Sequence, residues 1–155
     1  MPRPNDQHRT DFYSWTRRQS ALLRAGRLSD VDIENVAEEI EDMGRSEARE
    51  LRSILGQLIL HLLKWQHQPG RRSRSWAVSV AKQQKAFAQH INRNPGLKGL
   101  LDELYAEAWD IARLDAAGET DLPLRTFPDA PAWPLEDALR PGGPGGDCLW
   151  DEDGA

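Results

Sequence analysis

The sequence has little of several features that common functional classes require. It has a single cysteine, Cys148, among 155 residues, so no disulfide can form within the chain, and a reducing, cytosolic setting is expected. No stretch approaches the roughly 20 apolar residues of a membrane-spanning helix, and the first residues lack the apolar core of a secretion signal. We therefore expect a soluble, cytoplasmic protein that does not associate with membranes.

Motifs of several enzyme classes are also missing. The chain has neither a Gly-rich phosphate-binding loop nor a Gly-x-Ser-x-Gly element. Its only thiol, Cys148, lies in a Gly-rich, acidic C-terminal segment, which disfavours a cysteine nucleophile. The sequence therefore assigns no catalytic residue, and a non-catalytic protein is expected rather than an enzyme.

An excess of positive charge is absent as well. The 20 basic and 25 acidic residues give a formal charge of -5, and binding to nucleic acid begins with neutralisation of phosphates. Arg71, Arg72 and Arg74 precede Trp76, a combination of cations and an aromatic ring that can bind single strands. The patch is small and acidic helices can pair with it, so nucleic acid is the weakest of three functional interpretations.

What the sequence does have is helical periodicity, without the alternation of a half-buried strand. A hydrophobic content of 39% is enough for one modest core, so we expect a single all-α domain, a bundle of about five helices. Apolar residues at helical spacing predict five helices. They extend from Phe12 to a stop at Gly26, from Val31 through an acidic stretch, from Ile54 to Trp65, from Trp76 to Ile91, and from a start at Pro95 to Gly118. Asp11 or Thr10 is expected to cap the first helix, and Ser73 or Ser75 the fourth.

A break is predicted at Gly44. An unbroken helix from Val31 to Trp65 would be roughly 50 Å long. A compact chain of this length has a radius of gyration of roughly 15 Å. Such a helix does not fit in one compact unit, so Gly44 is expected to break or kink it.

The ends of the chain are predicted to differ from its middle. Residues 1–9 are expected to be flexible, residues 10–140 to form the helical domain, and residues 141–155 to form a disordered, acidic, Gly-rich tail. The prolines at positions 123, 128, 131 and 134 exclude a helix and predict an extended, proline-rich strap. Leu122, Phe127 and Trp133 in that strap are expected to fill a groove between helices.

The acidic stretch that follows Val31 carries the densest chemistry of the chain. At roughly 100° per residue one face is apolar, with carboxylates along its borders. The face consists of Ile33, Val36, Ala37, Ile40 and Met43; its borders carry Glu34, Glu38, Glu41 and Asp42 on one side and Asn35 and Glu39 on the other. The stretch is either an amphipathic helix with a solvated polar side or a site whose carboxylates hold a divalent cation or an arginine.

Several blocks resemble those of a known family. They are Asp11-Phe12-Tyr13-Ser14-Trp15-Thr16, the run from Glu34 to Glu47, His61-Leu62-Leu63-Lys64-Trp65-Gln66, Arg72-Ser73-Arg74-Ser75-Trp76, and Leu122-Pro123. Together they resemble the bacterial domain-of-unknown-function family numbered 29, over about residues 10 to 140. The resemblance implies an all-helical fold and no established activity. Where family members usually carry a Cys-Pro pair, this chain has Pro131-Ala132, which disfavours a mechanism based on that thiol.

A polar centre is the candidate site. The polar residues that fall within the resembling blocks are Glu38, Glu41, Asp42, Arg45, His61 and Arg74. The aromatic candidates are Trp15, Trp65 and Trp76. Gln83 lies on the apolar face of the fourth helix and needs hydrogen-bond partners if it is buried. Arg45 and Arg74 are expected to pair with the carboxylates, because the carboxylates would otherwise repel one another.

Three functions follow, in order of preference. The first is a non-catalytic protein-interaction module whose polar centre, Glu38, Asp42 and His61, is buried or half-buried and structural. The second is a metal-binding or metal-dependent, hydrolase-like bundle in which Glu38, Glu41 or Asp42 joins His61 as ligand. The third is the nucleic-acid binder. The expected partner is another protein, no cofactor is predicted, a divalent metal is the alternative, and the oligomeric state is open.

Overall fold

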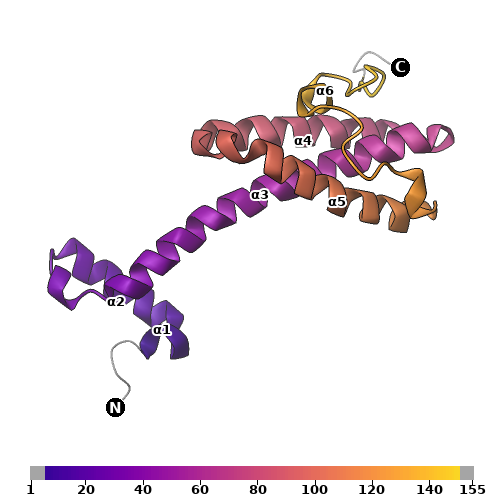
Figure 1. The fold of residues 1–155 in the computed structure, drawn as a ribbon. Helices are drawn as coiled ribbons and strands as arrows, with labels where there is room; N and C mark the ends of the chain where they lie inside the picture. The colour runs from indigo at the N-terminus through magenta and orange to yellow at the C-terminus, as the bar shows by residue number, and fades with distance from the viewer. Residues whose placement is uncertain (1–5, 151–155) are drawn as a thin grey trace. The chain divides into compact units, whose positions relative to one another are not determined.

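The computed structural model describes residues 6–150, and all regular structure in this range is helical (Figure 1). The α-helices are α1 (Gln7–Thr10), α2 (Phe12–Arg24), α3 (Ile33–His67), α4 (Arg74–Arg93), α5 (Leu101–Thr120) and α6 (Leu135–Leu139). Short 3-10 turns lie between them at Leu28–Asp30, Pro69–Arg71, Pro95–Leu100 and Leu124–Thr126. The all-α class is confirmed. Between residues 6 and 150 no helix is both long enough and apolar enough to cross a bilayer.

Local sequence signals place most helix ends correctly. The side chain of Asp11 accepts a hydrogen bond from the backbone N–H of Ser14 and caps α2, and Ser73 caps α4 by accepting from Trp76. Gly26, just after α2, has a φ of 70°, which suits glycine. Differences occur at α1, which forms where a flexible end was expected, and at Pro95, which begins a 3-10 turn rather than an α-helix.

The chain divides into two compact units with the boundary between Ser46 and Glu47, whereas the sequence led us to expect one. This division explains why the prediction of a break at Gly44 is wrong: α3 continues through Gly44 from Ile33 to His67. The limit on helix length applies to a helix inside one compact unit, and α3 contributes to both units. A glycine inside a helix costs about 1 kcal/mol relative to alanine, which is not enough to end one.

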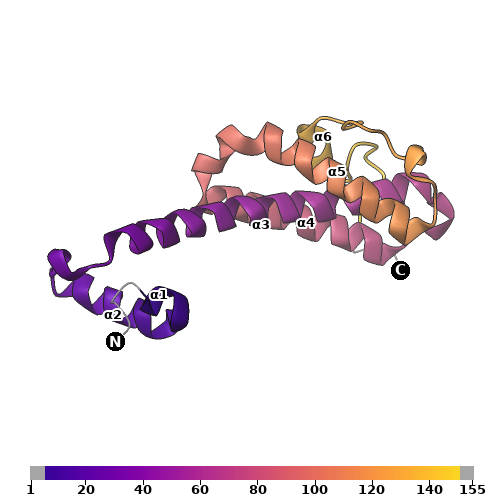
Figure 2. The same cartoon turned by 60° about the horizontal axis from the view of Figure 1, so that its bottom comes forward.

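The second unit holds the main core. Figures 1 and 2 show α4 and α5 running beside the second half of α3. Leu51, Leu55, Leu58, Ile59 and Leu63 of α3 have no exposed surface, which confirms the prediction of a central, apolar helix in this part of the chain. The core is completed from α4 and α5 by residues that include Val80, Phe87, Leu104, Ala108 and Trp109.

The proline-rich strap after α5 lies in a groove as predicted. Phe127 is 1% exposed and Trp133 8% exposed, and Leu122 packs against the core while partly buried. Polar contacts fix the strap to α5: Tyr105 donates to the carbonyl of Trp133 at 2.8 Å, and Trp109 Nε1 donates to that of Pro128 at 2.8 Å. The indole of Trp133 is bonded as well, because its Nε1 donates to Gln66 Oε1 at 3.2 Å, so the buried indoles of Trp109 and Trp133 each have a polar partner.

The disordered tail predicted from residue 141 is not found for residues 141–150. Cys148 is 4% exposed, and its N–H donates to the carbonyl of Gly142 at 3.0 Å, which closes a loop. Gly142, Gly143 and Gly146 have φ angles of 82°, 73° and 71°, so the glycines that resemble a disorder signal are the residues that let the loop turn. Residues 151–155, and residues 1–5 of the expected flexible N-terminus, lie outside the described range.

Candidate functional site

The carboxylates of the expected polar centre are on the surface, so a buried or half-buried centre is not formed. Glu38, Glu41 and Asp42 are all exposed. Arg45 forms the predicted pairs, with Asp42 at 3.0 Å and with Glu41 at 3.5 Å. Such pairs one helical turn apart at the surface contribute at most about 0.5 kcal/mol each.

His61 is half-buried and uses its ring within its own helix. Its Nδ1 lies 2.8 Å from the carbonyl oxygen of Gln57 and donates to it. The acidic segment and His61 belong to one continuous helix, α3, which runs through Gly44 without a break. In the described part of the chain, no three His, Cys, Asp or Glu side chains are grouped so that they could hold a metal ion.

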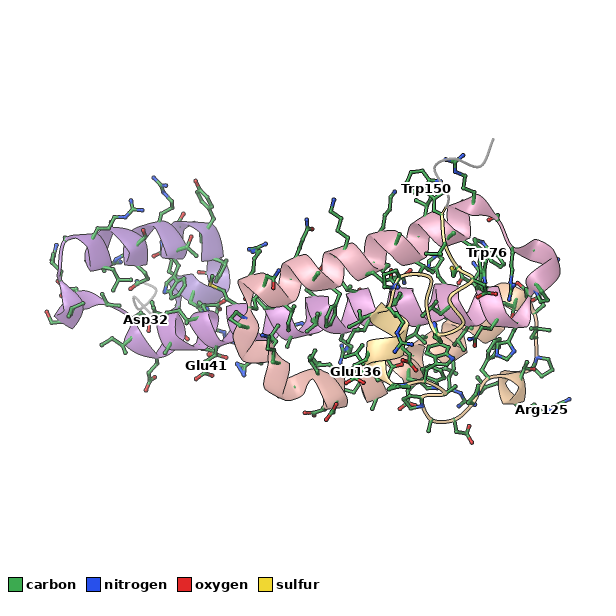
Figure 3. All side chains as sticks on the ribbon, turned by 90° about the horizontal axis from the view of Figure 1, so that it is seen from above. Asp32, Glu41, Trp76, Arg125, Glu136 and Trp150 are labelled. Atoms are coloured by element: carbon green, nitrogen blue, oxygen red, sulfur yellow. The ribbon has the colours of Figure 1, made fainter. Side chains whose placement is uncertain are left out.

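Arg74 does not pair with the acidic group. Its guanidinium lies over the ring of Trp150, 5.0 Å from the ring centroid. Trp150 is labelled in Figure 3. Arg72 is similarly engaged: it lies 4.9 Å from the centroid of the Trp65 ring, donates to the Trp65 carbonyl at 2.8 Å and pairs with Asp147 at 3.0 Å. Arg72 and Arg74 thus contact residues of the C-terminal loop.

Gln84 and His90, which the sequence pattern did not indicate as site residues, form hydrogen bonds between distant segments of the second unit. Gln84, not its neighbour Gln83, is the bonded glutamine, because its Nε2 donates to the carbonyls of Ala138 and Arg140 at 3.0 and 2.9 Å. His90 is 8% exposed and bonds to the carbonyl of Glu47 at 2.8 Å. Helical period places Gln84 and His90 near the apolar face, but their partners lie more than 40 residues away, where no local pattern points to them.

The single thiol is unsuited to nucleophilic chemistry. Burial of Cys148, with the adjacent carboxylate of Asp147, raises its pKa to about 11. The reactive form of a cysteine is the thiolate, which is scarce near neutral pH at such a pKa. This agrees with the absence of recognisable nucleophile motifs from the sequence.

The first unit has a polar centre of its own, at Asp32. Trp15 Nε1 and Asn35 Nδ2 both donate to one carboxylate oxygen of Asp32, at 3.1 and 2.8 Å, and the backbone N–H of Asp32 donates to Gln19 Oε1 at 2.8 Å. These bonds fix α2 against the start of α3, and Figure 3 shows Asp32 between the two helices. Trp15 is 2% exposed and, with Gln19, is one of only two buried residues in α2.

The apolar residues of this unit are largely uncovered. Ile33 is 64% exposed, Ile40 62% and Met43 69%, although the sequence analysis took them as residues of a core face. On α2, Phe12 is 49% and Leu23 45% exposed. We call these five residues the apolar face of the first unit. A groove of about 400 Å³ runs between the helices there and is lined by residues that include Trp15, Leu23, Val36 and Ile40.

Comparison with known proteins gives one match. No curated protein and no solved structure matches the chain. The profile of one family, described as "Domain of unknown function DUF29", matches residues 8–142, nearly the interval that the resemblance covered. This protein therefore belongs to the DUF29 family.

Proposed function

We propose that this protein is a non-catalytic protein-interaction module that binds another polypeptide through the apolar face of its first unit. The observation that carries the proposal is the exposure of Ile33, Ile40 and Met43, three large apolar side chains on one face of one helix. Single exposed apolar residues are normal on a protein surface, but a contiguous group marks an interaction site.

Helix α2 and the part of α3 that lies in the first unit leave most of their apolar residues uncovered. Their own packing buries only Trp15 and Gln19 of α2, and no residue of α3 before Leu51 is buried. Trp15 Nε1 donates to the Asp32 carboxylate and Gln19 Oε1 accepts from the Asp32 backbone N–H, and these two bonds hold α2 against the start of α3 without a large apolar core. A surface held rigid before binding loses less conformational entropy when the partner arrives.

The other interpretations have less support. A metal-dependent function would need ligands that converge, and Glu38, Asp42 and His61 are not grouped in the structure. A nucleic-acid function would need free cations, and Arg72 and Arg74 lie against the C-terminal loop. A cytosolic location, which the single cysteine favours, belongs to the proposal.

Site-specific photo-crosslinking tests the proposal. A photoreactive residue at position 40 in the full chain, expressed in cells, is expected to give a discrete protein adduct. The matched control carries the same residue at position 18, where exposed Arg18 lies on the side of α2 away from the groove. The adduct should disappear when Ile33 is also changed to Asp. Absence of an adduct at position 40, or equal adducts at positions 40 and 18, would contradict the proposal.

A further inference from the structure

The two helices of the first unit each have more apolar surface than one neighbour can cover. At roughly 100° per residue, the arc on α2 from Leu22 through Trp15 and Phe12 to Leu23 spans roughly 100° and is apolar except for Gln19, and the apolar arc from Met43 to Ala37 on α3 spans roughly 120°. One helix packed against another covers only part of such an arc, whereas a helix in a four-helix bundle contacts two neighbours.

The uncovered half of each arc points in a defined direction. Asp32 faces α2, to which it is hydrogen-bonded, and Glu41 lies on the side of α3 away from α2 (Figure 3). Ile33 and Ile40 fall between these two directions on the helical wheel, where a second neighbour of α3 would pack. On α2 the corresponding direction holds Leu23, which lines the groove together with Arg24.

The charges that border this surface have opposite signs on the two helices. Helix α2 contains three arginines and no carboxylate. The first part of α3 contains Glu34, Glu38, Glu39, Glu41 and Asp42 with only Arg45 in opposition. Among the ion pairs of residues 6–46, none uses Arg17, Arg18 or Arg24, and none uses Glu34 or Glu38.

We propose that the polypeptide bound by the apolar face is a second copy of this chain, and that two first units join as a four-helix bundle. In this bundle α2 of each copy lies against α3 of the other. The inference rests on the proposed function and names its partner. A two-fold axis brings the same surface of both copies together. We call Arg17 and Arg24 the basic rim of α2, and Glu34 and Glu41 the acidic rim of α3. In the bundle the basic rim of each copy lies against the acidic rim of the other.

The charges of the two rims also favour a second copy over other partners, and one pairing of the four helices over another. A bundle with α2 against α2 and α3 against α3 would oppose like charges along both seams. A partner helix of one charge sign would be attracted by one rim of the groove and repelled by the other. A second copy in the proposed arrangement satisfies both rims, and every neighbouring pair of helices in it is antiparallel when the axis runs along the bundle.

Charge reversal on the purified full-length chain tests the inference by sedimentation equilibrium. The basic-rim variant carries Arg17→Glu and Arg24→Glu, and the acidic-rim variant carries Glu34→Lys and Glu41→Lys. The wild type is expected to dimerise, and each variant alone should have a dimer dissociation constant raised by roughly tenfold or more. An equimolar mixture of the two variants should regain a dimer, because each reversed rim then meets its opposite. Arg18→Glu, the same charge change on the other side of α2, is the control, and circular dichroism checks that all variants fold.

The outcomes separate the inference from the proposed function. A wild-type chain that stays monomeric up to about 100 µM, a concentration at which specific protein pairs associate, overturns self-association. If position 40 then crosslinks to a protein of another mass, the interaction module stands and its partner is a different chain. Crosslinking of the chain to itself together with failure of the mixture to restore the dimer overturns the proposed arrangement of helices. No adduct at position 40 overturns the proposed function.

Discussion

Replacement of Gly143 by alanine should destabilise the second unit. Gly143 has a φ of 73°, a left-handed conformation that costs a residue with a Cβ about 1–2 kcal/mol. An added Cβ would lie 2.7 Å from Cδ2 of Leu62, whose side chain is 1% exposed and cannot move into solvent. Overpacking in a core adds about 1–3 kcal/mol, so the full cost should be about 2–5 kcal/mol.

A matched control separates the two causes. Gly146 has a φ of 71° in the same loop, but nothing lies within 4 Å of a Cβ placed there. Gly146→Ala should therefore carry only the conformational cost of about 1–2 kcal/mol. The difference between the two variants isolates the contact with Leu62.

Tryptophan fluorescence during guanidinium unfolding measures this difference, because only Trp15 of the six tryptophans lies outside the second unit. Wild type and both variants should show one transition with similar slopes and with midpoints in the order wild type, Gly146→Ala, Gly143→Ala. Free energies of unfolding for the two variants that agree within about 0.5 kcal/mol would refute the reasoning. The loop of residues 141–150 would then not be packed on Leu62.

Three further predictions concern titration and ligands. Burial lowers the pKa of His67, which contacts the ring of Phe127. As the pH falls, His67 is therefore protonated at a higher pH in the unfolded chain than in the folded one. Stability should therefore fall as the pH drops below about 6.5, and His67→Gln should weaken this dependence in melting curves across that range. Zinc or manganese should leave the melting temperature unchanged, while His61→Ala should lower it through lost packing; a saturable, His61-dependent rise would instead support the metal alternative. Because burial raises the pKa of Cys148 to about 11, iodoacetamide should label it slowly in the folded protein and quickly in denaturant; equal rates would show an accessible thiol.

The sequence by itself determined the helices and the strap, because the forces that specify them are local. Asp11 and Ser73 cap helices through bonds to residues three positions away. The period of the apolar residues between Ile54 and Leu63 requires a helix that is buried nearly all round, and it is. Prolines at fixed positions excluded an α-helix between Asp121 and Pro134, which left Phe127 and Trp133 to pack from a largely extended segment.

Only the tertiary structure decided which apolar faces are covered and which polar groups meet. The periodicity that placed Ile33 and Ile40 on one face of a helix is the same whether that face is buried or open, because coverage depends on segments far away in the chain. Arg74 had carboxylates to pair with in the sequence, but it lies over Trp150, which is 76 residues away. The high glycine content of residues 141–150 predicted disorder, because composition carries no information about the backbone conformation of each glycine. The loop is ordered because its glycines supply the positive φ angles that bring Cys148 into the core.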